Sequence, residues 1–142
     1  MRVKLKRFDK SLPIPEYKTA GAIGFDLYIR NSEKIGPHEV AAFPSNIGVA
    51  IPRGHLLLVT SRSSTAGKFG LLVIPGTIDP DFCGDEDEMK ISVFNLTDKT
   101  VEVTAGTRIA QGIFYKVSKV EFIETEKMNH RSRGGFGTTG HH

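Results

Sequence analysis

The feature of this sequence that most restricts its fold is a series of short apolar runs broken by glycine and proline. Three of them follow one another, at Val40–Phe43, Asn46–Ile51 and Leu56–Thr60, with a proline in each gap. Nowhere does the chain show a long apolar repeat of 3.6 residues. Short strands at this spacing, separated by turn residues, predict an all-β sandwich or barrel.

Other segments fit the same pattern. Residues 2–8 alternate basic and apolar side chains, which is typical of a half-buried strand, and the proline-containing residues 10–18 are predicted to form a loop. Alternation also predicts strands at Met89–Asn95, at Lys99–Val103 and, last in the chain, at Val120–Ile123. One helical turn is expected, within Ser63–Lys68.

Composition limits the class of protein. A chain of 142 residues, 39% hydrophobic and 25% charged, is expected to form one globular domain. No apolar run approaches the roughly 20 residues that span a bilayer, and the polar N-terminus is no signal peptide, so no membrane partner is expected. A net charge of +3 permits an anionic ligand but is too small to indicate stable nucleic-acid binding. The single cysteine, Cys83, excludes an intrachain disulfide framework and favours a cytoplasmic location. His141 and His142 resemble the remains of a purification tag.

Residues Gly76–Gly84 combine two glycines and a proline with carboxylates and one aromatic ring. Glycine permits close approach of a ligand, and proline fixes φ. We interpret the segment as a tight hairpin that presents Asp79, with Phe82 as an apolar wall beside it. An ordinary acidic turn is the alternative. The run Asp85–Glu88 is predicted to be a solvated turn, because consecutive acids rarely point at one ion.

Three polar residues lie in apolar strands and therefore need partners. Asp26 is expected to be hydrogen-bonded, to cap a loop or to lie near a metal. Arg108 and Gln111 could contact an internal group, such as a buried carboxylate, or a ligand.

Two further segments suggest an anion site. In Arg62–Gly70, an arginine precedes hydroxyl residues that can donate to phosphate oxygens, although the segment is no P-loop and could be a surface turn. The glycine-rich Arg131–Gly140 is either a disordered tail, a single-strand nucleic-acid binder or a lid. As a lid it would grip a phosphate chain with Arg131 and stack Phe136 on a base.

Five stretches, in order, resemble the five motifs of the trimeric dUTPases: Ala20–Leu27, Arg62–Gly70, Gly76–Gly84, Gly106–Phe114 and Arg131–Gly140. The resemblance implies a jelly-roll-like distorted β-barrel that forms a homotrimer with active sites at the subunit interfaces. It also implies Mg²⁺-dependent hydrolysis of dUTP to dUMP and pyrophosphate. That reaction keeps uracil out of DNA and supplies dUMP for thymidylate synthesis.

The resemblance assigns roles to individual residues. Asp79 would orient the attacking water, Phe82 would pack under the deoxyribose in place of the usual tyrosine, and Asp26 would contact Mg²⁺ through water, with the triphosphate holding most of the ion. Arg108 would organise the site. The other substrate-binding positions implied are Arg62, Ser63, Ser64, Gly76, Ile78, Gln111, Arg131, Gly135 and Phe136. Residues 1–127 would form the β domain and residues 128–140 a flexible lid, with 141–142 left from a tag.

The chain departs from the family pattern in three places. Phe82 lacks the tyrosine hydroxyl, and the acidic run makes the stretch from Gly84 to Phe94 a few residues longer than usual. The tail reads Arg-Ser-Arg-Gly-Gly-Phe where the family motif reads Arg-Gly-Ser-Gly-Gly-Phe. Two alternatives therefore stay open. One is a dCTP deaminase of the same fold, which would need a catalytic glutamate such as Glu86 or Glu88. The other is a non-catalytic module that binds nucleotides or single-stranded nucleic acid. Cys83 is a poor nucleophile candidate, because no nearby histidine is evident to activate it.

Overall fold

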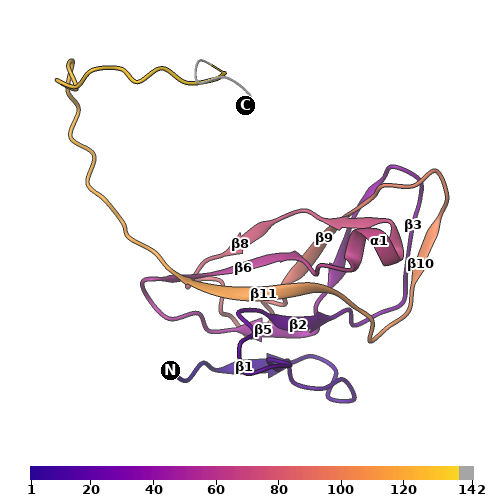
Figure 1. Cartoon of the computed structure of the whole chain (residues 1–142). Coiled ribbons are helices and arrows are strands. Elements are labelled where there is room, and N and C mark those ends of the chain that lie inside the picture. The colour runs from indigo at the N-terminus through magenta and orange to yellow at the C-terminus, as the bar shows by residue number, and fades with distance from the viewer. Residues whose placement is uncertain (138–142) are drawn as a thin grey trace.

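The computed structural model describes residues 1–137, and its regular secondary structure consists almost entirely of antiparallel strands (Figure 1). The larger sheet has the order β2 (Phe25–Tyr28), β11 (Arg108–Lys116), β6 (His55–Ser61) and β8 (Gly76–Ile78). The second sheet has the order β4 (Val40–Pro44), β9 (Lys90–Asn95) and β7 (Leu71–Val73). Two ribbons complete the fold, β1 (Leu5–Arg7) with β5 (Ile47–Val49) and β3 (Glu33–Ile35) with β10 (Val101–Val103). No helix in this part of the chain is long and apolar enough to cross a membrane.

One apolar core lies between these sheets, and alternation along the strands builds it. In β9, Ile91 and Val93 are fully buried, whereas Ser92 and Phe94 face away from the core. The larger sheet contributes Leu27, Leu57 and Ile109 to the same cluster. The all-β, jelly-roll-like prediction is therefore confirmed.

The predicted strands mostly form. Each of the apolar runs before residue 61 contains a strand, and so do the predicted segments from Met89 to Phe114. The helical turn is also confirmed, as α1 (Thr65–Phe69), which ends at Gly70 in the left-handed conformation (φ 65°). Two three-residue strands, β3 and β7, were not predicted, because so short a run carries little alternation.

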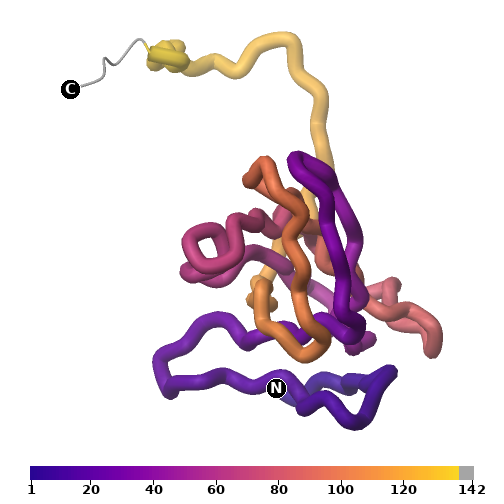
Figure 2. Tube along the Cα trace, turned by 90° about the vertical axis from the view of Figure 1, so that its right-hand side faces the viewer, coloured from indigo at the N-terminus to yellow at the C-terminus, as the bar shows by residue number. Residues whose placement is uncertain are grey.

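Two sequence predictions about strands were wrong. Val120–Ile123 forms no strand: after β11 the chain leaves the body in an extended path, as the two perpendicular views show (Figures 1 and 2). Its alternation is real, but nothing among residues 1–137 pairs with it, and a strand needs a hydrogen-bonded neighbour. Gly76–Gly84 is no hairpin either, because β8 pairs with β6 and the chain then crosses to β9 in the other sheet.

The prediction that Asp85–Glu88 form a solvated turn was wrong for Glu88, the last residue of the run. Glu88 is 6% exposed and accepts hydrogen bonds from Arg30 Nε at 2.8 Å and Arg30 Nη2 at 2.9 Å. The backbone N–H of Asn46 donates to the same carboxylate at 2.8 Å. Burial raises the pKa of Glu88, but these donors outweigh it and leave the pKa below its usual value. Only Asp85–Asp87 remain an exposed or half-buried turn.

Candidate active site

The clearest polar cluster surrounds Asp26 on β2. Its carboxylate contacts Arg62 Nε at 2.8 Å and Arg108 Nη1 at 3.0 Å, one guanidinium on each oxygen. Asp26 is almost buried, whereas the Arg62 and Arg108 side chains are 29% and 39% exposed. The internal partner anticipated for Arg108 is thus Asp26. The carboxylate holds two arginines in fixed positions, and both remain accessible to an anion from solvent.

Thr65, which the sequence did not single out, fixes the segment that follows β6. Its hydroxyl is fully buried, accepts from the Arg62 amide at 3.0 Å and donates to the Ile109 carbonyl at 2.7 Å. Arg62 also donates from Nη1 to the Arg108 carbonyl at 3.0 Å. These bonds tie the first turn of α1 to β11. Ser63 and Ser64 are exposed on this anchored turn, where their hydroxyls can meet a ligand.

Gln111 lies in the middle of the same sheet. Its backbone is opposite Asp26 on one side and Thr60 on the other, and its side-chain amide donates to the Ser61 carbonyl at 3.0 Å. Gly24 leaves room for this side chain, because a Cβ at Gly24 would overlap the Gln111 amide oxygen. The structure therefore brings Asp26, Arg62, Arg108 and Gln111 close together at one end of the larger sheet. We call Asp26, Arg62, Thr65 and Arg108 the Asp26 cluster.

Asp79 lies elsewhere in the chain. Leu57 pairs with Ile78 in the β6–β8 ladder, so Asp79 continues that register beside Leu56. Arg62 is six residues beyond Leu56 along the same extended segment. At about 3.3 Å per residue, this places Arg62 about 20 Å from Asp79 along the sheet. One chain thus does not bring Asp79 to the Asp26 cluster.

The surroundings of Asp79 are open. It lies with Pro80 and Asp81 on one wall of a cleft whose other walls are Arg53–Leu56 and the start of the C-terminal segment at Val117 and Lys119. Residues 79–89 join β8 to β9, and we call residues 79–87 of this connection the Asp79 loop. Phe82 is 39% exposed on this loop, and its amide donates to the Asp79 carbonyl at 3.1 Å. Gly76 and Ile78 lie on β8, at the base of the loop.

The predicted tail residues lie far from both regions. Arg131 and Phe136 are exposed on the extended segment that leaves the body, with Gly135 between them (Figure 2). Thr138–Gly140, the end of the predicted lid, fall outside the described residues. Residues 131–137 therefore lie near neither Asp79 nor Arg62 of their own chain.

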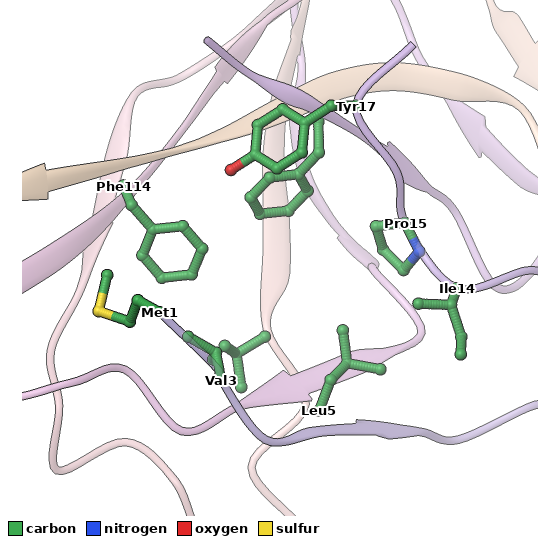
Figure 3. Close-up of a pocket in the computed structure, with 9 residues that line it drawn as sticks. Met1, Val3, Leu5, Ile14, Pro15, Tyr17 and Phe114 are labelled. Carbon is green, nitrogen blue, oxygen red and sulfur yellow. The ribbon is translucent and has the colours of Figure 1, made fainter. Parts of the chain in front are cut away.

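Two further kinds of site are relevant among residues 1–137. No group of three or more His, Cys, Asp or Glu side chains there is arranged to hold a metal ion. A hollow of about 390 Å³ near β1 is lined by apolar groups, among them Met1, Val3, Leu5 and Phe114 (Figure 3). Its lining includes no charged side chain, so it is unsuited to a triphosphate.

Comparison with known proteins fits this arrangement. The dUTPase family model matches residues 10–140. The chain is 40% identical over 144 residues to the deoxyuridine 5′-triphosphate nucleotidohydrolase of Helicobacter pylori strain P12, an alignment that covers 99% of this chain and 97% of that protein. The protein of the same name from Orientia tsutsugamushi strain Boryong is 38% identical over 149 residues, with 99% of each chain covered.

Solved structures agree on the fold. A mutant dUTPase of Staphylococcus bacteriophage 80alpha with dUpNHpp superposes with a TM-score of 0.88 at 22% identity, over 98% of both chains. A mutant dUTPase of phage phi11 of S. aureus, solved to show the coordination of a structural Mg(II) ion, gives 0.82 at 19% identity over 92% of this chain and 100% of that one. With a family model over nearly its whole length and relatives of up to 40% identity, the chain belongs to the dUTPase family.

Proposed function

We propose that this protein hydrolyses dUTP to dUMP and pyrophosphate. The observation that carries the proposal is the Asp26 cluster, in which two arginines are held ready for an anion on a chain that matches the dUTPase family from residue 10 to 140. Relatives named deoxyuridine 5′-triphosphate nucleotidohydrolase support the choice of substrate. In the cytoplasm, where we expect the protein to work, this reaction lowers dUTP and supplies dUMP.

The chemistry follows from the residue types. Cleaving a phosphoanhydride needs charge neutralisation and a positioned water more than a covalent nucleophile. Arg62 and the hydroxyls of Ser63 and Ser64 supply donors for phosphate oxygens. Asp79 orients the attacking water toward the phosphorus and accepts a proton from that water as its oxygen attacks. Phe82 packs under the deoxyribose, where its ring leaves no space for a 2′-hydroxyl.

We propose Mg²⁺ as the cofactor, bound mainly by the triphosphate. When bound it supplies positive charge to the phosphate oxygens. Asp26 is the residue that would contact its water shell, because each carboxylate oxygen holds one guanidinium and can accept a further hydrogen bond. The absence of a three-ligand cluster in residues 1–137 fits an ion that arrives with the nucleotide.

We further propose that the working site forms between chains of a homotrimer. Asp79 and Arg62 are about 20 Å apart along one sheet, too far to act on one phosphate, so a second chain must supply one of them. The C-terminal segment also needs a partner: Phe122 and Ile123 are 92% and 85% exposed, and the apolar hollow of Figure 3 is open. Assembly would bury such surfaces. Residues 128–140 would then act as a lid over a neighbour's site.

One assay separates this function from its closest alternative. The protein is incubated with dUTP, dCTP, dTTP or UTP and Mg²⁺, and pyrophosphate and ammonia are measured. Pyrophosphate is expected from dUTP in strong preference to the other nucleotides. Ammonia from dCTP would instead indicate a deaminase, but Glu88, one of the two glutamates available for that role, is bound by Arg30 and the Asn46 amide.

A further inference from the structure

The Asp79 loop joins the rest of its chain through one buried charged residue. Every side chain from Asp81 to Glu86 is exposed, and the first buried residue after Asp79 is Glu88. Both oxygens of Glu88 are bound by Arg30, through Nε at 2.8 Å and Nη2 at 2.9 Å, and Lys90 Nζ lies 3.5 Å away. The loop therefore ends at a fixed, two-bonded ion pair.

Other contacts extend this attachment to neighbouring strands. The Asn46 amide donates to Glu88 Oε2 at 2.8 Å, and Asn46 in turn exchanges hydrogen bonds with the backbone of Asp9. Arg30 lies in the segment that follows β2, the strand that carries Asp26. The ion pair thus connects the end of the Asp79 loop to the β2 segment and to the corner between β4 and β5.

Within the loop, the bonds are short-range. Phe82 N donates to Asp79 O at 3.1 Å, and Gly84 N donates to Asp87 Oδ2 at 2.7 Å. One side-chain bond reaches outside, from Lys6 Nζ to the Asp85 carbonyl at 2.6 Å. These turns give the loop its shape. Its position on the body is set at its end, by the Glu88 ion pair together with Met89, whose N–H donates to the Ile47 carbonyl at 2.9 Å and whose carbonyl accepts from the Ser45 N–H at 3.0 Å.

We infer that Glu88 and Arg30 are positioning residues, which hold the Asp79 loop so that Asp79 and Phe82 meet the substrate. The inference rests on the proposed function. Replacing a buried ion pair by apolar residues of similar size is often neutral for stability, so stability alone does not account for an ion pair at the end of this loop. Misplacement of a catalytic group by about 1 Å can cost about 100-fold in rate.

The test uses the full-length protein with the changes Glu88→Ala and Arg30→Lys. The first removes the anchor, and the second keeps the charge but loses the two-pronged geometry of the guanidinium. We expect faster amide hydrogen exchange at residues 79–87, a fall in kcat of about 10- to 100-fold with a smaller change in KM, and a lower preference for dUTP over UTP. Arg30→Lys should show smaller changes in the same direction.

The matched control is Val103→Ala, a cavity in β10, away from the loop. Compared at temperatures that give equal fractions folded, this variant should keep normal exchange in residues 79–87 and a normal dUTP preference. The inference is overturned if Glu88→Ala and Arg30→Lys behave like Val103→Ala in both measurements. If Glu88→Ala does not fold, Arg30→Lys decides. A wild-type protein that leaves dUTP intact would refute the proposed function, while the exchange measurement would still test the anchor.

Discussion

The Asp26 cluster and the Asp79 loop are built in opposite ways. The cluster is nearly complete within one chain: an almost buried carboxylate holds two arginines, and Thr65 fixes the turn beside them. The loop is exposed, lies about 20 Å away along the sheet and has its firmest attachment at one end. Under the proposed function, the arginines that bind the anion are therefore held in position before the ligand arrives, whereas the placement of Asp79 depends on assembly and on the Glu88–Arg30 ion pair.

The contrast has a physical reason. Two neighbouring arginines repel each other, and the Asp26 carboxylate between Arg62 and Arg108 offsets that repulsion. A general base, the role proposed for Asp79, has the opposite requirement, since its carboxylate must remain free to accept a proton from water. Substitutions in the two regions should accordingly differ in whether they reduce stability together with activity.

The largest effect is expected for Asp79→Asn. The change keeps the size of the side chain but removes the charge that accepts the proton of the water, so kcat should fall by about 10²- to 10⁴-fold. Because Asp79 is exposed and in no ion pair within residues 1–137, Tm should stay unchanged. Steady-state kinetics with dUTP and a thermal melt measure both. Near-normal turnover would mean that the loop is structural only.

Asp26→Asn serves as the comparison for that variant. It leaves Arg62 and Arg108 without their shared carboxylate, a loss of charged hydrogen bonds worth about 1–3 kcal/mol, so Tm should fall along with activity. If Asp79→Asn lowered Tm as much as Asp26→Asn does, the distinction between the two regions would fail.

A second large effect tests which chains supply the parts of each site. A chain ending at Met128 retains all the strands, since β11 ends at Lys116, and it should assemble but lose most activity. Asp79→Asn is expected to be nearly inactive as well. Co-refolding the two should restore activity, because some mixed sites combine an intact Asp79 with an intact tail from another chain. Were the tail to close over its own chain's Asp79, the mixture would stay inactive.

Much of this could be predicted from the sequence, and the failures have a common cause. Alternation located most strands, and the polar residues Asp26, Arg108 and Gln111, which interrupt apolar strands, have internal partners in the structure. Alternation at Val120–Ile123 could not reveal that the chain offers no neighbouring strand. The pairing of Glu88 with Arg30, 58 residues away, was hidden because it depends on how two distant segments are placed. Local patterns predict elements, but partners depend on tertiary structure.

Phe82→Ala should have an intermediate effect, on specificity. The ring is half-exposed on the Asp79 loop and carries no hydroxyl, so it can distinguish deoxyribose from ribose only by filling space. The ratio of kcat/KM for dUTP over UTP should fall by about 10- to 100-fold, the range expected from a change in packing alone. Equal use of the two nucleotides by the wild-type protein would remove this role from Phe82.

The smallest effect concerns acid stability, and it comes from Glu88. In the folded protein the pKa of Glu88 lies below its usual value of 4.5, because hydrogen bonds from Arg30 and the Asn46 amide outweigh the opposing effect of burial. A carboxyl with a depressed pKa stabilises the folded state above its unfolded pKa, and this contribution is lost as the pH falls through the folded value. The hydrogen bond to Glu88 raises the pKa of Arg30, so the guanidinium stays charged throughout this range.

Glu88→Gln should therefore be less stable than the wild type at pH 7, and the difference should shrink as the pH is lowered from about 5 toward 3. Denaturant unfolding at several pH values measures it. Glu16→Gln is the matched control, since Glu16 pairs with Lys18 on the surface and such pairs contribute little. A stability difference for Glu88→Gln that stayed constant with pH would mean that the carboxylate charge is not what holds this end of the Asp79 loop. Some contact other than the Glu88–Arg30 ion pair would then have to hold the Asp79 loop in place.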